Sequence, residues 1–177
     1  LCAALLAAGA AGAQSVEYGG SRWRIIVESL ETQGGECALV LRDASGKSLY
    51  AVEDGQSLCV VKAYISVGGS LISPFLVSGD LERVEFYFEA DSPPDAVRIC
   101  PAGGDIGEAP ELLLEGDFLY RVEYGEASVA RYLGSDEAVS VPGELGGAPV
   151  TAIGDSAFQG KSEMVQVELP ETVADIG

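Results

Sequence analysis

Histidine is absent from the 177-residue sequence. Its absence removes the side chain used most often as a general base and as a zinc ligand, and with it every Ser–His or Cys–His nucleophile pair. Catalysis would have to rely on carboxylates, lysine or tyrosine. We therefore expect a protein that is not an enzyme, with no catalytic residue, no metal ligand and no cofactor.

Basic residues are also scarce. Ten Lys and Arg residues stand against 28 Asp and Glu, which gives a formal net charge of −18. A field of that sign repels nucleic-acid phosphates and anionic lipids. We expect no nucleic-acid partner, and a membrane contact would need an anchor outside this chain. The acidity serves solubility or attracts a cationic partner.

A long apolar run occurs at the start of the chain, where residues 1–13 read LCAALLAAGAAGA. Thirteen residues are too few to span a bilayer. The run ends in Ala11-Gly12-Ala13, which is typical of the cleavage site of a secretory signal peptide. We expect residues 1–13 to be part of such a peptide and the mature chain to be extracellular or at the cell surface. Cys2 as a lipid-anchor residue is the alternative, although a polar tether usually follows such a cysteine.

Three cysteines remain after this segment: Cys37, Cys59 and Cys100. No two of them have the C-x-x-C spacing of a metal knuckle or a redox motif. They are expected either as buried thiols or as one disulfide with one thiol left over, and the pairing stays open. Asp43 and Asp105 lie in glycine-containing turns, which explains both without a metal, and no D-x-D-x-D-G calcium loop is present.

Short stretches rich in β-branched and aromatic residues follow one another up to residue 101. They predict strands at residues 21–30, 37–43, 57–67, 81–90 and 95–101, separated by turns rich in Gly, Asp, Ser and Pro. This spacing predicts a β-sandwich-like domain over residues 14–101. The separation of Cys37 and Cys100 would suit an immunoglobulin-type bridge between sheets. However, Trp23 precedes the pair, and no tyrosine stands two residues before Cys100. The stretches ISVGGSLISPF (65–75) and ERVEFYF (82–88) resemble a β-sandwich domain of secreted Gram-positive proteins.

Residues 102–117 are rich in Gly and Glu and are predicted to be a linker. A second unit is predicted over residues 118–177. It begins with two strand-like stretches, FLYRVEY (118–124) and ASVARYL (127–133), which predict a hairpin with its turn at Gly125-Glu126.

The pair Ile153-Gly154 recurs as Ile176-Gly177, 23 residues later. Each copy follows an apolar strand pattern and a proline, and the first copy holds a five-residue insertion around Gly146-Gly147. The two patterns comprise Val139, Val141 and Pro142, and Val165, Val167, Leu169 and Pro170. A short strand in each 23-residue period is typical of a solenoid, whose coils bury their apolar faces against one another. Alternation in VQVEL places Gln166 and Glu168 on the face opposite Val165, Val167 and Leu169.

The pattern of strand, Pro, Ile-Gly and Ala-Phe-x-Gly resembles the BspA-like leucine-rich repeats of bacterial surface proteins over residues 118–177. The preceding hairpin looks like the entry cap of such an array. Family repeats usually carry cysteine and leucine where this chain has Lys161 and Met164, so we expect Lys161 to be more exposed or irregular. Asp155 and Ser156 are predicted to cap a short helical turn whose Phe158 fills the coil.

The resemblance implies a secreted or cell-surface protein with a non-catalytic binding or adhesion role through its repeat array. Its partner would be a protein or a polysaccharide, with Gln166 and Glu168 as candidate contacts. The alternative is a targeting or spacer region of a larger extracellular enzyme, such as a carboxylate-dependent hydrolase, whose catalytic domain lies outside this chain. Within the chain, Glu85 and Glu89 are the carboxylates to test for such chemistry.

Overall fold

The fold is mainly β, as predicted. The computed structural model describes residues 13–177, so the predicted signal peptide lies outside the described residues except for Ala13. Within this range the helical content is one 3-10 turn, η1 (Ile106–Glu108). Strands account for the rest of the regular structure, in two large sheets and two small ones.

The first large sheet is built by the N-terminal half of the chain. Its strands are ordered β1-β2-β3-β9-β8 and all neighbours are antiparallel. Their bounds are β1 (Gln14–Tyr18), β2 (Ser21–Gln33), β3 (Glu36–Asp43), β8 (Leu76–Gly79) and β9 (Arg83–Glu89). Edge strand β8 is short and fully exposed.

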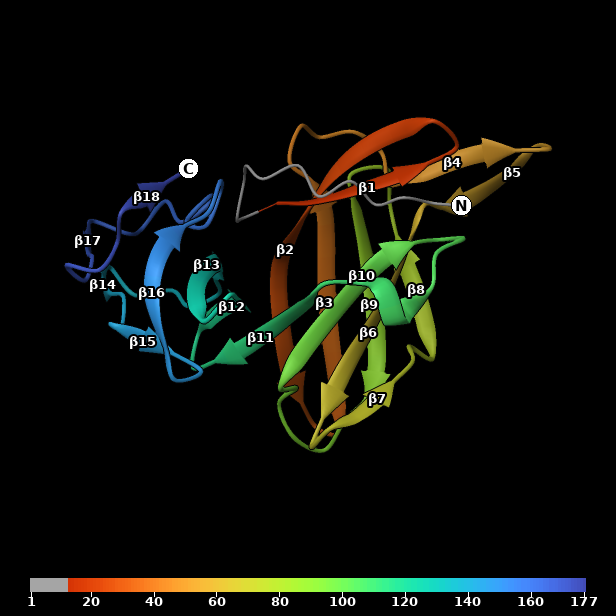
Figure 1. The fold of residues 1–177 in the computed structure, drawn as a ribbon. Helices are drawn as coiled ribbons and strands as arrows, with labels where there is room; N and C mark the ends of the chain where they lie inside the picture. Colours follow the sequence, from red (N-terminus) through yellow and green to blue (C-terminus); the bar gives the residue numbers. More distant parts are fainter. Residues whose placement is uncertain (1–12) are drawn as a thin grey trace.

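The second large sheet has nine strands and runs from the N-terminal half into the C-terminal part (Figure 1). Its order is β7-β6-β10-β11-β12-β13-β16-β15, and β18 pairs with β16. The bounds are β6 (Val61–Val67), β7 (Ser70–Ile72), β10 (Ala96–Pro101), β11 (Glu111–Glu115), β12 (Phe118–Glu123), β13 (Glu126–Tyr132), β15 (Glu144–Leu145), β16 (Ala148–Ile153) and β18 (Asp175–Ile176). Two small sheets pair β4 (Tyr50–Glu53) with β5 (Gln56–Cys59), and β14 (Ala138–Ser140) with β17 (Gln166–Glu168).

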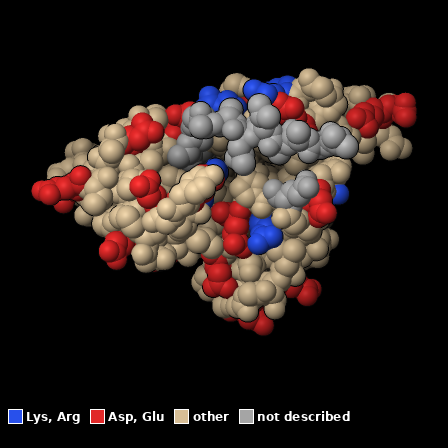
Figure 2. Space-filling model, viewed as in Figure 1, with Lys and Arg blue, Asp and Glu red and all other residues tan. Residues whose placement is uncertain are grey.

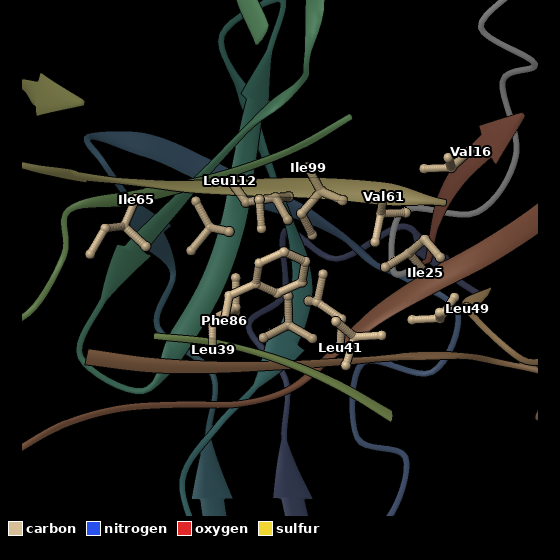
Figure 3. Close-up of a cluster of buried hydrophobic side chains, with 14 of the residues drawn as sticks. Val16, Ile25, Leu39, Leu41, Leu49, Val61, Ile65, Phe86, Ile99 and Leu112 are labelled. Carbon is tan, nitrogen blue, oxygen red and sulfur yellow. The ribbon is translucent and has the colours of Figure 1, made fainter. Parts of the chain in front are cut away.

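The two large sheets share one hydrophobic core. In Figure 3, Ile65, Ile99 and Leu112 of the second sheet point toward Leu39, Leu41 and Phe86 of the first. All six are at most 4 % exposed. The alternation of buried and exposed residues along β3 and β9 produces this layer, because every second side chain points to the same face.

Most predicted strands are present, but two predicted details are wrong. The expected strand at 57–67 is two strands, β5 and β6, which belong to different sheets and are separated at Val60. The hairpin of β12 and β13 turns at Tyr124-Gly125, with Glu123 opposite Glu126. Both turn residues have positive φ, 55° and 82°, as in a two-residue type I′ turn.

The predicted linker, residues 102–117, contains strand β11. This strand pairs with β10 on one side and with β12 on the other. Leu112 of β11 and Leu119 of β12 both belong to the core shared by the two sheets. The backbone hydrogen bonds of the second large sheet therefore continue through residues 102–117, where a linker between two domains was expected.

A second core lies in the C-terminal part. Its buried members are Tyr120, Ala127, Val129, Val141, Leu145, Ala148, Val150, Ile153 and Ala157. Parallel pairs bring successive parts of the chain together around this core: β13 with β16, β14 with β17, and β16 with β18. The five-residue insertion is the β15–β16 hairpin, whose turn residues Gly146 and Gly147 both have positive φ.

The three cysteines after the N-terminal segment are free thiols. Cys37 lies in the core between the sheets, whereas Cys100 is buried but does not belong to that core. Its neighbours Val97 and Ile99 point into the core, so alternation along β10 turns Cys100 to the opposite face. The two thiols therefore lie on different sides of the second sheet, which rules out an immunoglobulin-type bridge. Burial raises the pKa of both thiols.

Candidate binding surface

The two side chains predicted to contact a partner lie together on β17. Gln166 and Glu168 are both exposed, and Gln166 Nε2 donates a hydrogen bond of 3.0 Å to Glu168 Oε1. β14 lies beside them, with Ala138 opposite Gln166 and Ser140 opposite Glu168, both exposed. We call these four residues the β14–β17 face. It presents one carboxylate, one amide and one hydroxyl on a short parallel sheet.

Backbone contacts at both ends of β17 hold this face in place. The N–H groups of Val165 and Gln166 both donate to Glu137 O, at 2.7 and 3.1 Å, and the N–H of Val141 donates to Glu168 O at 2.9 Å. Between the two polar residues, Val167 is half-buried and packs against the second core. The alternation predicted for VQVEL is thus present in β17 itself, while the flanking Val165 and Leu169 are exposed.

The register of the parallel pairs repeats the spacing of the Ile-Gly pairs. Ala152 lies opposite Asp175 and Ile153 opposite Ile176, each 23 residues apart. In the small sheet of β14 and β17, Ala138 lies opposite Gln166, 28 residues apart. The difference, 28 − 23 = 5, matches the five-residue insertion of the β15–β16 hairpin, which lies between Ser140 and Ala152.

The segment after Gly154 differs from the prediction of a capped helical turn. Residues 155–160 form a series of turns instead, with Ser156 at a φ of 66°. Asp155 is paired with Arg24 of β2 at 2.8 Å rather than with the backbone of a helix. Phe158 packs against the margin of the second core, 6.0 Å from the ring of Tyr132 between centroids.

Lys161 was expected to be exposed or irregular; it is half-buried and directly follows the turns of residues 155–160, so its position is irregular rather than exposed. Its Nζ donates to the backbone oxygens of Leu133 and Gly134, at 3.0 and 2.5 Å, and lies 5.4 Å from the ring centroid of Tyr132. Burial and the nearby Arg131 lower the pKa of this ammonium group, while Asp117 acts in the opposite direction. The ammonium group ties the turn segment to the end of β13.

Replacing Lys161 with methionine is expected to lower the free energy of unfolding by about 1.5 kcal/mol, because two backbone carbonyls lose a charged donor. Chemical denaturation of both proteins measures the difference. Arginine at this position keeps the charge and serves as the matched control, with a smaller loss. A stability equal to that of the wild type in the methionine variant would contradict the structural role given to this ammonium group.

Sequence reasoning missed a group of basic side chains between the first sheet and the turn segment. Arg131 is 3 % exposed, and its Nη1 donates to Ser156 O at 2.6 Å. Burial and the neighbouring Arg42 lower the pKa of its guanidinium group, and Glu28 partly offsets this. Glu28 itself is paired with Arg83 at 2.9 Å. Arg24–Asp155 joins the first sheet to the turn segment, and Arg131 lies close enough to Arg42 and Glu28 of that sheet for their charges to act on it. These residues are far apart in sequence and share no motif.

The candidate catalytic carboxylates are not brought together. Glu85 and Glu89 lie on the same face of β9 but four residues apart, which is about 13 Å along a strand. Paired carboxylates in glycoside hydrolysis are separated by roughly 5–9.5 Å. Glu85 accepts a 2.5 Å hydrogen bond from the Tyr87 hydroxyl, and Glu89 lines a shallow recess with Glu36 and Asp91.

Asp43 and Asp105 have the structural roles predicted for them. Asp43 is 1 % exposed and accepts hydrogen bonds from the backbone N–H groups of Arg24, Ser45 and Lys47 and from the Ser45 hydroxyl. Asp105 caps η1 and accepts from Gly107 N–H at 3.0 Å. Among residues 13–177, no group of three or more acidic or cysteine side chains is arranged to hold a metal ion.

Carboxylates are spread over the visible face of the molecule, at both the N-terminal and the C-terminal part, with few basic groups between them (Figure 2). In the part of the chain that the structure describes, no helix is long and apolar enough to cross a bilayer. Comparison with models of protein families, with curated proteins and with solved structures finds no match. The candidate function therefore depends on the geometry described above.

Proposed function

We propose that residues 118–177 form the entry cap and first coils of a leucine-rich-repeat solenoid, preceded by a β-sandwich-like domain. In this proposal the chain belongs to an extracellular or cell-surface protein that binds a partner without catalysis, in the manner of BspA-like proteins. The partner is a protein or a polysaccharide. It contacts the β14–β17 face, and further coils would extend that face.

The observation that carries the proposal is the parallel register of the coils. Ile153 lies opposite Ile176 at the 23-residue period of the Ile-Gly pairs, and β14 stacks on β17 in the same direction. Successive coils of a solenoid place equivalent residues side by side in parallel strands. The sandwich-like description of the first part is supported by the core shared between its two sheets.

The chemistry of the β14–β17 face fits a polar partner. The Gln166 amide and the Ser140 hydroxyl each offer a donor and an acceptor, and the Glu168 carboxylate is an acceptor only. Sugar hydroxyls or basic side chains are the complementary groups. The net charge of −18 attracts cationic proteins at long range and repels acidic polysaccharides.

A binding screen with paired variants tests this function. Immobilised neutral and acidic polysaccharides and immobilised basic proteins serve as probes for the whole chain. For a probe that binds, the double variant Gln166→Ala, Glu168→Ala is expected to reduce affinity at least about tenfold, because it removes two polar contacts of about 1 kcal/mol each.

The matched control is Gln159→Ala, Glu163→Ala, which removes the same two residue types at exposed positions outside β17. This control is expected to bind as the wild type does. Equal losses in both double variants, or full binding by the β17 variant, would show that the β14–β17 face is not the contact surface.

A further inference from the structure

Exposed apolar side chains are concentrated around β7 and β8, on the side of the molecule opposite the β14–β17 face (Figure 1). Within residues 71–81, Leu71 is 48 % exposed, Phe75 53 %, Leu76 49 %, Val77 44 % and Leu81 72 %. We call these five residues the β8 flank. A large contiguous patch of exposed apolar side chains on a folded protein marks an interaction site.

The β8 flank lies where both large sheets end. β8 is the edge strand of the first sheet and β7 the edge strand of the second, with the connection between them on the same flank. Val77 pairs with Phe86, whose side chain is buried in the core, so Val77 points to the core side of the sheet. It is nevertheless 44 % exposed, because β7 has only three residues and leaves the core side of β8 uncovered.

The backbone of β8 has unpaired groups along its outer edge. Asp80 N–H, just after β8, donates to Arg83 O of β9 at 3.0 Å. Because hydrogen-bonded pairs alternate along an antiparallel ladder, the β8 residues whose backbone groups bond to β9 are the even-numbered ones. Alternation then directs the N–H and C=O groups of Val77 and Gly79 away from β9. Natural edge strands are usually blunted by lysine, other charges or a bulge. β8 carries no charged residue, and only its length of four residues limits its edge.

Most of this region is also uncharged. Residues 63–79 contain no Asp, Glu, Lys or Arg in a chain that is 21 % charged. The nearest acid along the chain is Asp80, whose Oδ1 accepts from the N–H groups of Glu82 and Arg83, at 2.8 and 3.0 Å, within its own turn. Along residues 71–79 a second copy therefore meets no like charge from this segment, although Asp80, Glu82 and Glu85 lie in the adjoining turn and in β9.

We infer that the β8 flank is a dimer contact: the β8 strands of two copies pair antiparallel about a two-fold axis, with each Val77 opposite the other. In this register the outward N–H and C=O groups of the two Val77 residues pair with each other, as a two-fold axis requires. Leu76 of each copy then lies opposite Ser78 of the other. Phe75, whose N–H donates to Tyr87 O within its own chain, stays outside the new pairing.

A second copy suits the flank because one uncharged strand supplies both sides of the contact. A charged peptide would be drawn to other surfaces, where the carboxylates and guanidinium groups lie. Two acidic chains repel one another at long range, and salt screens that repulsion while strengthening apolar contacts. The dimer is therefore expected to tighten as the ionic strength rises, whereas a contact made of ion pairs would weaken.

Sedimentation velocity of the whole chain over a concentration series, at about 0.15 M and about 1 M NaCl, tests the inference. The expected result is a shift from a species of 18.3 kDa to one of twice that mass, at lower concentration in high salt. Val77→Lys places two ammonium groups on the two-fold axis and is expected to weaken the dimer at least about tenfold. Val52→Lys, on the exposed β4 hairpin, is the matched control and leaves the dimer unchanged.

Leu76→Lys replaces Val77→Lys if circular dichroism finds that variant unfolded. Hydrogen exchange provides a second readout, with the amide of Val77 slowing as dimer forms. A monomer at every concentration in both salts would overturn the inference. A dimer that the β8 variants leave intact, or that Val52→Lys weakens equally, would overturn it as well.

Discussion

Replacing Leu119 with alanine is expected to lower the free energy of unfolding by about 2–5 kcal/mol, the range for truncating a buried leucine. Leu119 lies on β12, in the part predicted from sequence to be a separate unit. It is nevertheless 1 % exposed within the core shared by the two large sheets. The cavity left by the substitution opens beside side chains of the N-terminal half, so both halves lose stability together.

The single tryptophan reports this coupling. Trp23 is 5 % exposed in the same core, on β2 of the first sheet, and its fluorescence follows unfolding of the N-terminal half. We expect Leu119→Ala to shift this transition to lower denaturant concentration, in step with circular dichroism. Val165→Ala, also in the C-terminal part but 83 % exposed, should change stability by less than about 0.5 kcal/mol. A Trp23 transition unaffected by Leu119→Ala would mean that residues 118–177 fold independently.

Asp43→Ala is expected to lower the free energy of unfolding by about 2–4 kcal/mol, because a buried carboxylate disappears and leaves several donors without an acceptor. The side chain joins β2 to the loop after β3 through Arg24, Ser45 and Lys47. Asp43→Asn keeps one acceptor oxygen and should lose less. Asp105→Ala removes a single exposed hydrogen bond and provides the matched control, with a loss of about 0.5–1 kcal/mol.

The contribution of Asp43 also depends on pH. Burial alone would raise the pKa of this carboxyl, but the hydrogen bonds from Ser45, Arg24 and Lys47 outweigh burial and lower it below 3.8. Its stabilisation is therefore complete above the unfolded-state pKa and is lost as the pH falls through the folded-state pKa. The stability difference between wild type and Asp43→Ala should stay constant from pH 7 to about pH 4 and shrink below it. A difference that grows on acidification would contradict this sign.

The strands that sequence reasoning predicted are those with clear alternation over a half-buried surface. β3 and β9 are examples, since each carries every second side chain into the core. Short or exposed strands such as β7, β8 and β4 escaped because three or four residues give too little periodicity to recognise. β11 was hidden by the Gly- and Glu-rich composition around it, although its ELLLE run could have been interpreted as a strand.

For the candidate surface, periodicity alone was sufficient to place Gln166 and Glu168 on one exposed face. Periodicity could not provide the contacts that hold the turn segment, because Lys161, Arg131 and Asp155 bind groups 25 to 131 residues away. Nor could it assign Cys100 to a face, since a strand buried on both sides has no polar alternation to read.

The continuous nine-stranded sheet has a mechanical consequence. Neighbouring strands from β6 through β10, β11 and β12 to β13 are joined by backbone hydrogen bonds, with no flexible tether between the halves. Tension applied along these strands, between the N-terminal half and residues 118–177, would load many of these bonds in shear at once. Tension across them would break the bonds one at a time. The direction of pulling would thus decide whether the chain resists traction as one body or peels apart strand by strand.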